Sequence, residues 1–242
     1  MQGHGTKQPI RVMSALPIRG AFDTAIGPEL TARGESCTVD WSPTTIIVEK
    51  LQRGETCDAV FVVAETLDQL IAEGRIDART RTDIVRSRYG VAVKAGAPHP
   101  DVATLESFQA TLLSARSVAF SRSGASGIYF QALLDRLGLA EEIKAKATIV
   151  PAGLTAERLV TGEADIAIQQ ISELLAVPGI EIAGPFPEGA QQTIDFAYAA
   201  TSDAANPDGA RAFLDALRSP KATSAYKQAG LDPLFEARAD LS

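Results

Sequence analysis

Short apolar segments alternate with segments of helical spacing along the first third of the chain. Ile10–Ala15 and Ala59–Val63 are apolar runs of strand length, and Ile18–Arg33 carries apolar residues four apart on one face. The full order of expected strands and helices is Ile10–Ala15, Ile18–Arg33, Thr38–Trp41, Ile46–Arg53, Ala59–Val63 and Leu67–Glu73. Strands that alternate with helices in this way predict a parallel α/β sheet with right-handed crossovers.

A second α/β unit follows, in which strands and helices alternate less regularly. The expected strands are Arg86–Val93, Ser117–Ser121, Ala147–Val150, Asp165–Gln169, Ile180–Ala183 and Thr193–Ala200. The expected helices are Leu105–Ala115, Ile128–Leu137, Thr155–Val160, Pro207–Leu217 and Ser224–Ala229, and Leu174–Pro187 reads as irregular around its short strand. The closing strand and helices need a sheet on which to pack, so we expect them to return to the first unit.

Two crossovers between two α/β units predict a hinged, two-lobed clamp. We expect the crossovers near Arg86–Tyr89 and Gln191–Phe196, with Arg86, Ser87 and Arg88 at the hinge. The expected division is lobe 1 over 9–87, lobe 2 over 88–192 and a return to lobe 1 over 193–242, after a disordered leader or tag at 1–8. A monomer is the default for this architecture.

Composition excludes several classes of function. The net charge of −7 argues against nucleic acid, whose binding needs clustered Lys and Arg. Only two cysteines and two histidines are present, without metal-ligand spacing, so we expect no metal, no cofactor and two free thiols, Cys37 and Cys57. No segment has membrane-spanning length, and the N-terminus lacks the apolar run of a secretory signal. We expect a periplasmic protein whose signal has been removed, with a cytoplasmic protein as the alternative.

The loops after the expected strands carry small hydrogen-bonding residues, and ligands of open α/β sheets bind at this edge. The candidate ligand-binding residues are Ser14, Ala15, Leu16, Ser42, Pro43, Thr44, Ala64, Arg122, Ser123, Ser126, Gly127, Gln169 and Gln170. Hydroxyls and the free amides of helix N-termini suit a small oxyanion or carboxylate. Plain helix capping is the alternative role for Ser42 and Thr44.

Catalytic patterns are weaker than binding patterns. No nucleophile elbow occurs, and the Ser121–Gly127 loop lacks the lysine of a phosphate-binding loop. Glu65 and Glu173 lie beside the candidate loops. Either one is a candidate base for proton transfer, and either one is alternatively a carboxylate that favours a helix N-terminus.

Three segments resemble the periplasmic molybdate-binding proteins, the class II solute-binding receptors of ABC transporters. These segments are Arg53–Phe61, Ser126–Tyr129 with Leu137–Leu139 after it, and Gly162–Asp165, and the similarity runs from about Ile10 to Pro233. The resemblance implies the two-lobed type II periplasmic-binding-protein fold. It also implies ligand-binding roles for Ser14, Ser42 and Ser126.

The chain departs from this family at the position of its ligand-binding tyrosine, which is Gln170 here. The sequence also looks like a divergent branch that includes aconitate isomerases, enzymes that shift a proton and a double bond within a tricarboxylate. The resemblance therefore implies two alternatives. We expect the receptor of an ABC uptake system, which closes on a small anion and signals to a permease. The alternative is an isomerase in the same cleft, with Arg122 and Arg19 or Arg86 as cationic partners and Glu65 or Glu173 as base.

Overall fold

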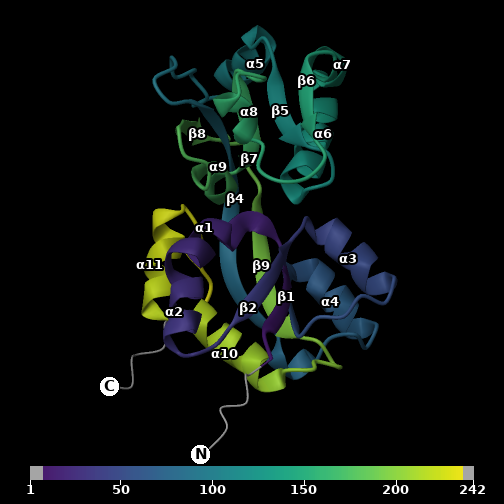
Figure 1. Ribbon diagram of the computed structural model, residues 1–242. Helices are drawn as coiled ribbons and strands as arrows, with labels where there is room; N and C mark the ends of the chain where they lie inside the picture. The colour runs from purple at the N-terminus through teal and green to yellow at the C-terminus, as the bar shows by residue number, and fades with distance from the viewer. Residues whose placement is uncertain (1–7, 237–242) are drawn as a thin grey trace, which may run out of the picture.

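The protein consists of two α/β lobes stacked end to end in this computed structural model, which describes residues 8–236 (Figure 1). One long strand, β4 (Thr82–Lys94), runs through both lobes and joins their strands into one continuous sheet. Of the leader expected at 1–8, only Gln8 lies within the described residues, and the end of the chain from 237 lies outside them. The two-lobed α/β class expected from the sequence is confirmed.

The lower lobe in Figure 1 contains the strand order β2-β1-β3-β9-β4. Strand β1 (Ile10–Ser14) pairs in parallel with β2 (Cys37–Trp41) and β3 (Ala59–Val63), while β9 (Thr193–Ala200) runs antiparallel to β3 and β4. The other elements are η1 (Leu16–Ile18), α1 (Arg19–Ala21), η2 (Phe22–Ile26), α2 (Gly27–Ala32), α3 (Thr44–Gln52), α4 (Ala64–Ala72), η3 (Ala78–Thr80), α10 (Pro207–Leu217), α11 (Pro220–Gln228) and β10 (Asp232–Pro233). Apolar clusters fill both faces of this sheet, as a parallel sheet requires.

The upper lobe continues the sheet as β4-β7-β5-β6, with β8 paired to the far part of β4. Its strands are β5 (Val118–Ser121), β6 (Ala147–Val150), β7 (Ile166–Gln170) and β8 (Ile180–Pro185). Its helices are α5 (Leu105–Ser114), α6 (Ala125–Leu137), α7 (Ala140–Lys144), α8 (Glu157–Val160) and α9 (Ile171–Leu175). The carboxyl ends of β5 and β7 therefore point toward the lower lobe, where β1 and β2 end.

Two of the differences from the sequence-based assignment concern β4 and β8; the structure also adds the short helix α7. Strand β4 begins at Thr82, before the expected Arg86, because its first half pairs with β9 in the lower lobe. The segment expected to be irregular holds part of α9 and the whole of β8, which extends through Gly184 and Pro185. Glycine suits position 184 because a Cβ there would lie 2.7 Å from a Cγ of Val102. The glycine that suggested a loop therefore allows close packing instead.

Strand β4 changes partners between Arg88, which pairs with β9, and Tyr89, which pairs with β7. The side chain of Gln191 spans this junction. Its Oε1 accepts the Tyr89 N–H at 3.0 Å, and its Nε2 donates to the Tyr89 carbonyl at 2.9 Å. On either side, Arg86 pairs with Asp195 and Arg88 with Asp232, while the buried hydroxyl of Ser87 has no partner. Gln191 thus holds the backbone where the two lobes meet.

We expect Gln191→Ala to lower the free energy of unfolding by about 1–3 kcal/mol, because it leaves the Tyr89 N–H without its partner, while the Tyr89 carbonyl keeps the Phe186 N–H at 3.1 Å. Urea denaturation measures this difference. The matched control is Gln192→Ala, next in sequence and exposed, which should change stability by less than about 0.5 kcal/mol. Equal effects of the two variants would contradict the role given to Gln191.

The two cysteines are free thiols that pack in different apolar clusters of the lower lobe, Cys37 with one and Cys57 with the other. Burial, with the nearby Asp58 carboxylate, raises the pKa of the Cys37 thiol to about 12. Burial also raises the pKa of the Cys57 thiol to about 11. Because the thiolate is the reactive form, the raised pKa values lower the reactivity of both thiols in the folded protein.

We expect a colorimetric disulfide reagent to modify both thiols at least about 100-fold more slowly in the native protein than in urea at neutral pH. Stopped-flow absorbance measures the two rates. Rapid modification of either thiol without denaturant would show that its side chain is not buried as described.

Candidate functional site

A small cavity lies between the lobes at the carboxyl ends of their strands. Its lining residues are Ala15, Leu16, Pro17, Pro43, Thr44 and Phe196 from the lower lobe and Ser121, Gly124, Ala125, Ser126, Gly153, Gln169, Gln170 and Glu173 from the upper lobe. This is the edge at which the sequence placed the candidate loops. Among the described residues that line the cavity, Glu173 carries the single ionisable side chain.

Helix N-termini from both lobes reach the cavity. Helix α6 begins at Ala125 and α3 at Thr44, and neither N-cap residue makes a side-chain capping bond. The first-turn amides of a helix lack intrahelical partners, and the positive end of the helix dipole attracts anions. The cavity therefore offers backbone donors and a favourable potential to a carboxylate or oxyanion.

Gly127 fixes the position of the first turn of α6. A Cβ at residue 127 would lie 1.8 Å from the Ser121 carbonyl oxygen, so only glycine allows this close approach. The Ser121 hydroxyl accepts the Gly124 N–H at 2.9 Å and holds the loop from the other side. Gly127 is thus a packing residue behind the cavity rather than part of its lining.

Glu173 is fully buried at the third position of α9. One carboxyl oxygen, Oε1, accepts from Nε2 of Gln170 at 3.2 Å, while Oε2 has no partner among the described residues. Burial raises the pKa of the Glu173 carboxyl to about 8. A carboxyl with such a pKa exchanges a proton near neutral pH, which suits an acid–base role. The helix-capping alternative is also supported, because a hydrogen bond from the backbone of Gln170, the N-cap residue of α9, lowers the pKa of the Glu173 carboxyl against the effect of burial.

The two adjacent glutamines differ in what they contact. Gln169 is fully engaged, because its Oε1 accepts from the Thr155 N–H at 2.7 Å and from the Thr155 hydroxyl at 2.9 Å, and its Nε2 donates to the Gly153 carbonyl at 3.3 Å. Gln170 donates to Glu173, and its buried Oε1 has no partner. Gln169 therefore shapes the cavity, and Gln170 has hydrogen-bonding capacity to spare.

The structure brings together most of the candidate residues from the sequence. Those that line the cavity are Ala15, Leu16, Pro43, Thr44, Ser126, Gln169, Gln170 and Glu173. The cavity also has lining residues that were not among the candidates from the sequence: Pro17, Ser121, Gly124, Ala125, Gly153 and Phe196. Of these, Ser121, Gly124 and Ala125 belong to the loop that the sequence did mark. Phe196 comes from β9, far along the chain, and no sequence signal marks it.

Other candidates lie outside the lining, for reasons that their contacts show. The Ser14 hydroxyl donates to the Ala15 carbonyl at 2.9 Å, and the Ser42 hydroxyl donates to Asp40 at 2.9 Å. Ala64 and Glu65 line a different hollow beside α4. The side chain of Arg122 is exposed in the loop before α6.

The lobes are closed over the cavity. The Thr45 hydroxyl on α3 donates across the gap to the Ser123 carbonyl at 3.0 Å, and Leu16 packs with Leu174 and Val177 of the other lobe. The enclosed volume is about 20 Å³, room for about one water molecule. A larger ligand therefore enters only when the lobes separate.

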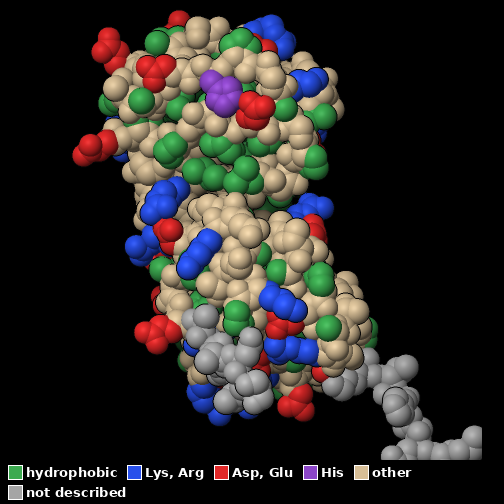
Figure 2. Space-filling view, turned by 90° about the vertical axis from the view of Figure 1, so that its left-hand side faces the viewer, with side chains coloured by type: hydrophobic (Ala, Val, Ile, Leu, Met, Phe, Trp, Pro, Cys, Tyr) green, Lys and Arg blue, Asp and Glu red, His purple; other side chains and the backbone are tan. Residues whose placement is uncertain are grey.

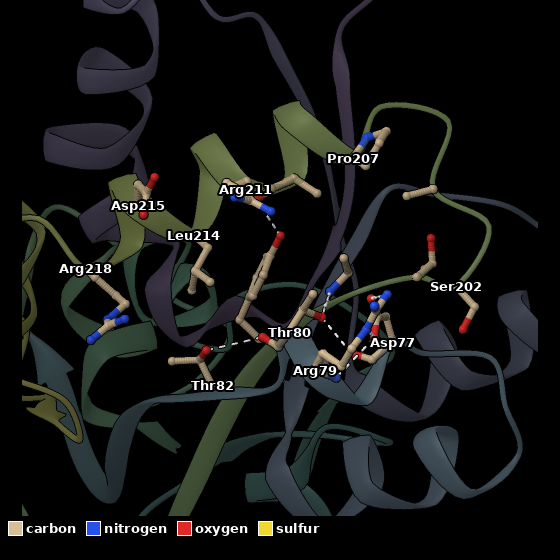
Figure 3. Close-up of a pocket in the computed structure, with 15 residues that line it drawn as sticks. Asp77, Arg79, Thr80, Thr82, Ser202, Pro207, Arg211, Leu214, Asp215 and Arg218 are labelled. Carbon is tan, nitrogen blue, oxygen red and sulfur yellow. Dashed lines mark hydrogen bonds and ion pairs between the residues drawn. The ribbon is translucent and has the colours of Figure 1, made fainter.

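A much larger cavity, of about 700 Å³, lies elsewhere, at the base of the lower lobe between η3, β9 and α10 (Figure 3). The Arg79 guanidinium binds the Asp77 carboxylate at 2.8 Å, and the Tyr198 hydroxyl donates to the Ala210 carbonyl. The buried Nε of Arg218 has no hydrogen-bond partner among the described residues. The surface view shows cationic and anionic side chains interspersed over both lobes (Figure 2). A large volume does not by itself identify a binding site. The helix N-termini and the buried Glu173 carboxyl favour the cavity between the lobes as the functional site.

No helix in the part of the chain that the structure describes is long and apolar enough to cross a membrane. The same residues contain no group of three or more His, Cys, Asp or Glu side chains placed to hold a metal ion. The cavity therefore draws on backbone amides, hydroxyls, amide side chains and one carboxyl for its chemistry.

Comparison with known proteins agrees with this geometry. The chain is 36% identical over 238 residues to an aconitate isomerase from a Pseudomonas species, with 94% of this chain and 90% of the relative covered. Its fold is similar to that of the periplasmic molybdate-binding protein of Azotobacter vinelandii, with a TM-score of 0.75, 18% identity and coverage of 92% and 98% of the two chains. A sulfate-binding protein from Mycobacterium tuberculosis gives a TM-score of 0.69, 16% identity and coverage of 94% and 87%.

These structural neighbours confirm the type II periplasmic-binding-protein fold expected from the sequence. The resemblance to molybdate-binding proteins and to the branch with aconitate isomerases is confirmed as well. The profile described as "Bacterial extracellular solute-binding protein" matches residues 10–232, nearly the whole length of the chain. The chain therefore belongs to the family of bacterial extracellular solute-binding proteins.

Proposed function

We propose that this protein is an isomerase of the aconitate type, which moves a proton and a double bond within a small tricarboxylate held between the lobes. The observation that carries the proposal is Glu173, a buried carboxyl in the cavity with one unpartnered oxygen. A protein that only binds an anion needs no group beside it that gains and loses a proton near neutral pH. The relative named aconitate isomerase supports the same activity.

The reaction needs one group that accepts and returns a proton. The Glu173 carboxylate removes a proton from the methylene carbon of aconitate, and the electron pair of the broken C–H bond moves into the conjugated double bond and carboxylate. The proton then returns from Glu173 to the former vinyl carbon, so that no atom is gained or lost. A carboxyl with a pKa near 8 is suited to both halves of this transfer.

The other cavity groups hold the substrate. The free amides at the start of α6, with the Ser126 and Thr44 hydroxyls, are placed to bind substrate carboxylates. Arg122, exposed in the same loop and without an ion-pair partner in the described chain, supplies a cation for a further carboxylate. Closure of the lobes excludes water from the proton in transit.

The second candidate is a receptor for a small anion that docks on the permease of an ABC uptake system in the periplasm. The match to a solute-binding family and the bonding capacity of the helix N-termini favour it. This role uses lobe closure as its output and needs no base.

Thermal shift and product analysis together separate the two candidates. A ligand at about a hundredfold excess over its dissociation constant stabilises the folded protein by about 2.7 kcal/mol, so binding is visible as a higher Tm. We expect shifts with cis- and trans-aconitate, and interconversion of the two isomers by proton NMR. A shift with molybdate, tungstate or sulfate alone, without interconversion, would favour the receptor and overturn the isomerase.

A further inference from the structure

The side-chain amide of Gln170 has one end on Glu173 and the other end in the cavity. Nε2 donates to Glu173 Oε1 at 3.2 Å, and Oε1 is buried without a partner. Only about 2% of the Gln170 side chain is exposed, and the residue lines the cavity. A buried acceptor without a hydrogen-bond donor destabilises the folded protein. In this orientation of the amide, Oε1 of Gln170 therefore needs a donor, which either a bound ligand or a rotation of the amide can supply.

The two ends of a glutamine amide have nearly the same shape, and the partners decide which end faces which way. An ionised Glu173 accepts two bonds and favours the NH2 end of Gln170. A protonated Glu173 needs an acceptor for its O–H and favours the carbonyl end. Rotation of the amide by about 180° satisfies the protonated form and turns the NH2 group toward the cavity.

We infer that Gln170 is a positioning residue whose amide orientation follows the protonation of Glu173, so that it presents an N–H donor to the ligand only when Glu173 holds a proton. This inference rests on the proposed function and deepens it. When Glu173 takes the substrate proton, negative charge develops on the substrate. The same proton transfer to Glu173 turns the NH2 group of Gln170 toward that charge. A hydrogen bond that forms only as the charge develops stabilises the transition state more than the bound substrate, and so accelerates the step.

The adjacent Gln169 shows that the arrangement of Gln170 is not general to this strand end. The Gln169 amide has partners at both ends, in Thr155 and Gly153, and Gln169 also lowers the pKa of the Glu173 carboxyl through a side-chain hydrogen bond. Tyr89, opposite Gln170 in the strand pairing, presents its backbone to Gln191 and β7, and burial together with the nearby Glu173 carboxylate raises the pKa of its hydroxyl. Among the described residues, Gln170 is thus left with Glu173 as its side-chain partner.

The test uses propane-1,2,3-tricarboxylate, which has the shape and charge of aconitate but no double bond to move. Calorimetry measures its affinity for the wild-type protein and for Gln170→Met, at about pH 6 and about pH 9.5, on either side of the Glu173 titration. We expect Gln170→Met to weaken binding at least tenfold at the lower pH and less than twofold at the higher pH. In a protein that carries Glu173→Gln, residue 173 is neutral at both pH values. There, the loss of affinity caused by Gln170→Met should be the same at both pH values.

A purely structural Gln170, or one that always donates to the ligand, gives an equal loss at both pH values in the wild-type background, and this result would overturn the inference. Gln170→Asn, which keeps an amide too short to reach both partners, should repeat the pattern if the methionine variant folds poorly. The result does not depend on turnover. A protein that binds the tricarboxylate with this pH pattern but does not isomerise aconitate would refute the proposed function and leave the Gln170 inference supported, whereas no binding at all would refute both.

Discussion

We expect Glu173→Gln to abolish the proposed isomerisation of aconitate and to make the folded protein more stable at neutral pH. A general base typically contributes about 10²–10⁴-fold to a rate, so we expect a loss of at least about a thousandfold in kcat. Glutamine has nearly the same shape as glutamate, and tricarboxylate binding should therefore persist. Proton NMR follows the interconversion, and calorimetry follows binding.

The gain in stability follows from the titration of the buried carboxyl. Between the ordinary pKa of 4.5 and the raised pKa of about 8, the folded protein holds a proton that the unfolded chain has released. The free energy of unfolding therefore falls by about 1.4 kcal/mol per pH unit across this window and levels off above it. Glutamine does not titrate, so the variant lacks this slope and is more stable than the wild type by about 3 kcal/mol near pH 7.

Urea denaturation over a series of pH values measures the slope. The matched control is Glu142→Gln, an exposed position on α7, which should leave both the slope and the activity as in the wild type. A Glu173→Gln variant with full activity would remove Glu173 from the mechanism. A pH slope that persists in that variant would assign the titration to another group.

Ser126→Leu should eliminate ligand binding while the protein still folds. Ser126 lies in the first turn of α6, is about 2% exposed and lines the cavity. A leucine side chain is much larger than the enclosed space of about 20 Å³, so it blocks the amides at the helix N-terminus and hinders closure of the lobes. We expect at least a hundredfold loss of affinity for aconitate, measured by calorimetry.

The matched control for Ser126→Leu is Ala132→Leu, at an exposed position further along the same helix, which should bind ligand normally. Circular dichroism checks that both variants are folded. Unchanged affinity of Ser126→Leu would show that the N-terminus of α6 is not part of the binding site and would undermine both candidate functions.

The alternation of strands and helices predicts the fold well because each local pattern agrees with the packing that it enters. It places β8 but ends it at Ala183, two residues early, because Gly184 allows close contact with Val102 rather than forming a loop. It also fails at the start of β4, whose pairing with β9 is set by residues more than a hundred positions away. Long-range pairing leaves little trace in a local sequence window.

The site is predicted in part, for a similar reason. Loops after strands mark the edge of the sheet, so Thr44, Ser126 and Gln170 were found. Sequence alone does not distinguish Glu65 from Glu173, because both begin a helix after a strand. The folded structure buries Glu173 and leaves Glu65 exposed. The choice between the two carboxyls therefore depends on tertiary packing that a local sequence window does not contain.

The closed, nearly filled cavity has a consequence for the kinetics of association. If the closed form predominates without ligand, only the open fraction of molecules captures a ligand, and the apparent dissociation constant rises in inverse proportion to that fraction. In a stopped-flow experiment the observed binding rate then reaches a plateau at high ligand concentration, equal to the rate at which the lobes part. A variant that loses the Thr45 hydroxyl, which joins the lobes through the Ser123 carbonyl, should have a higher plateau.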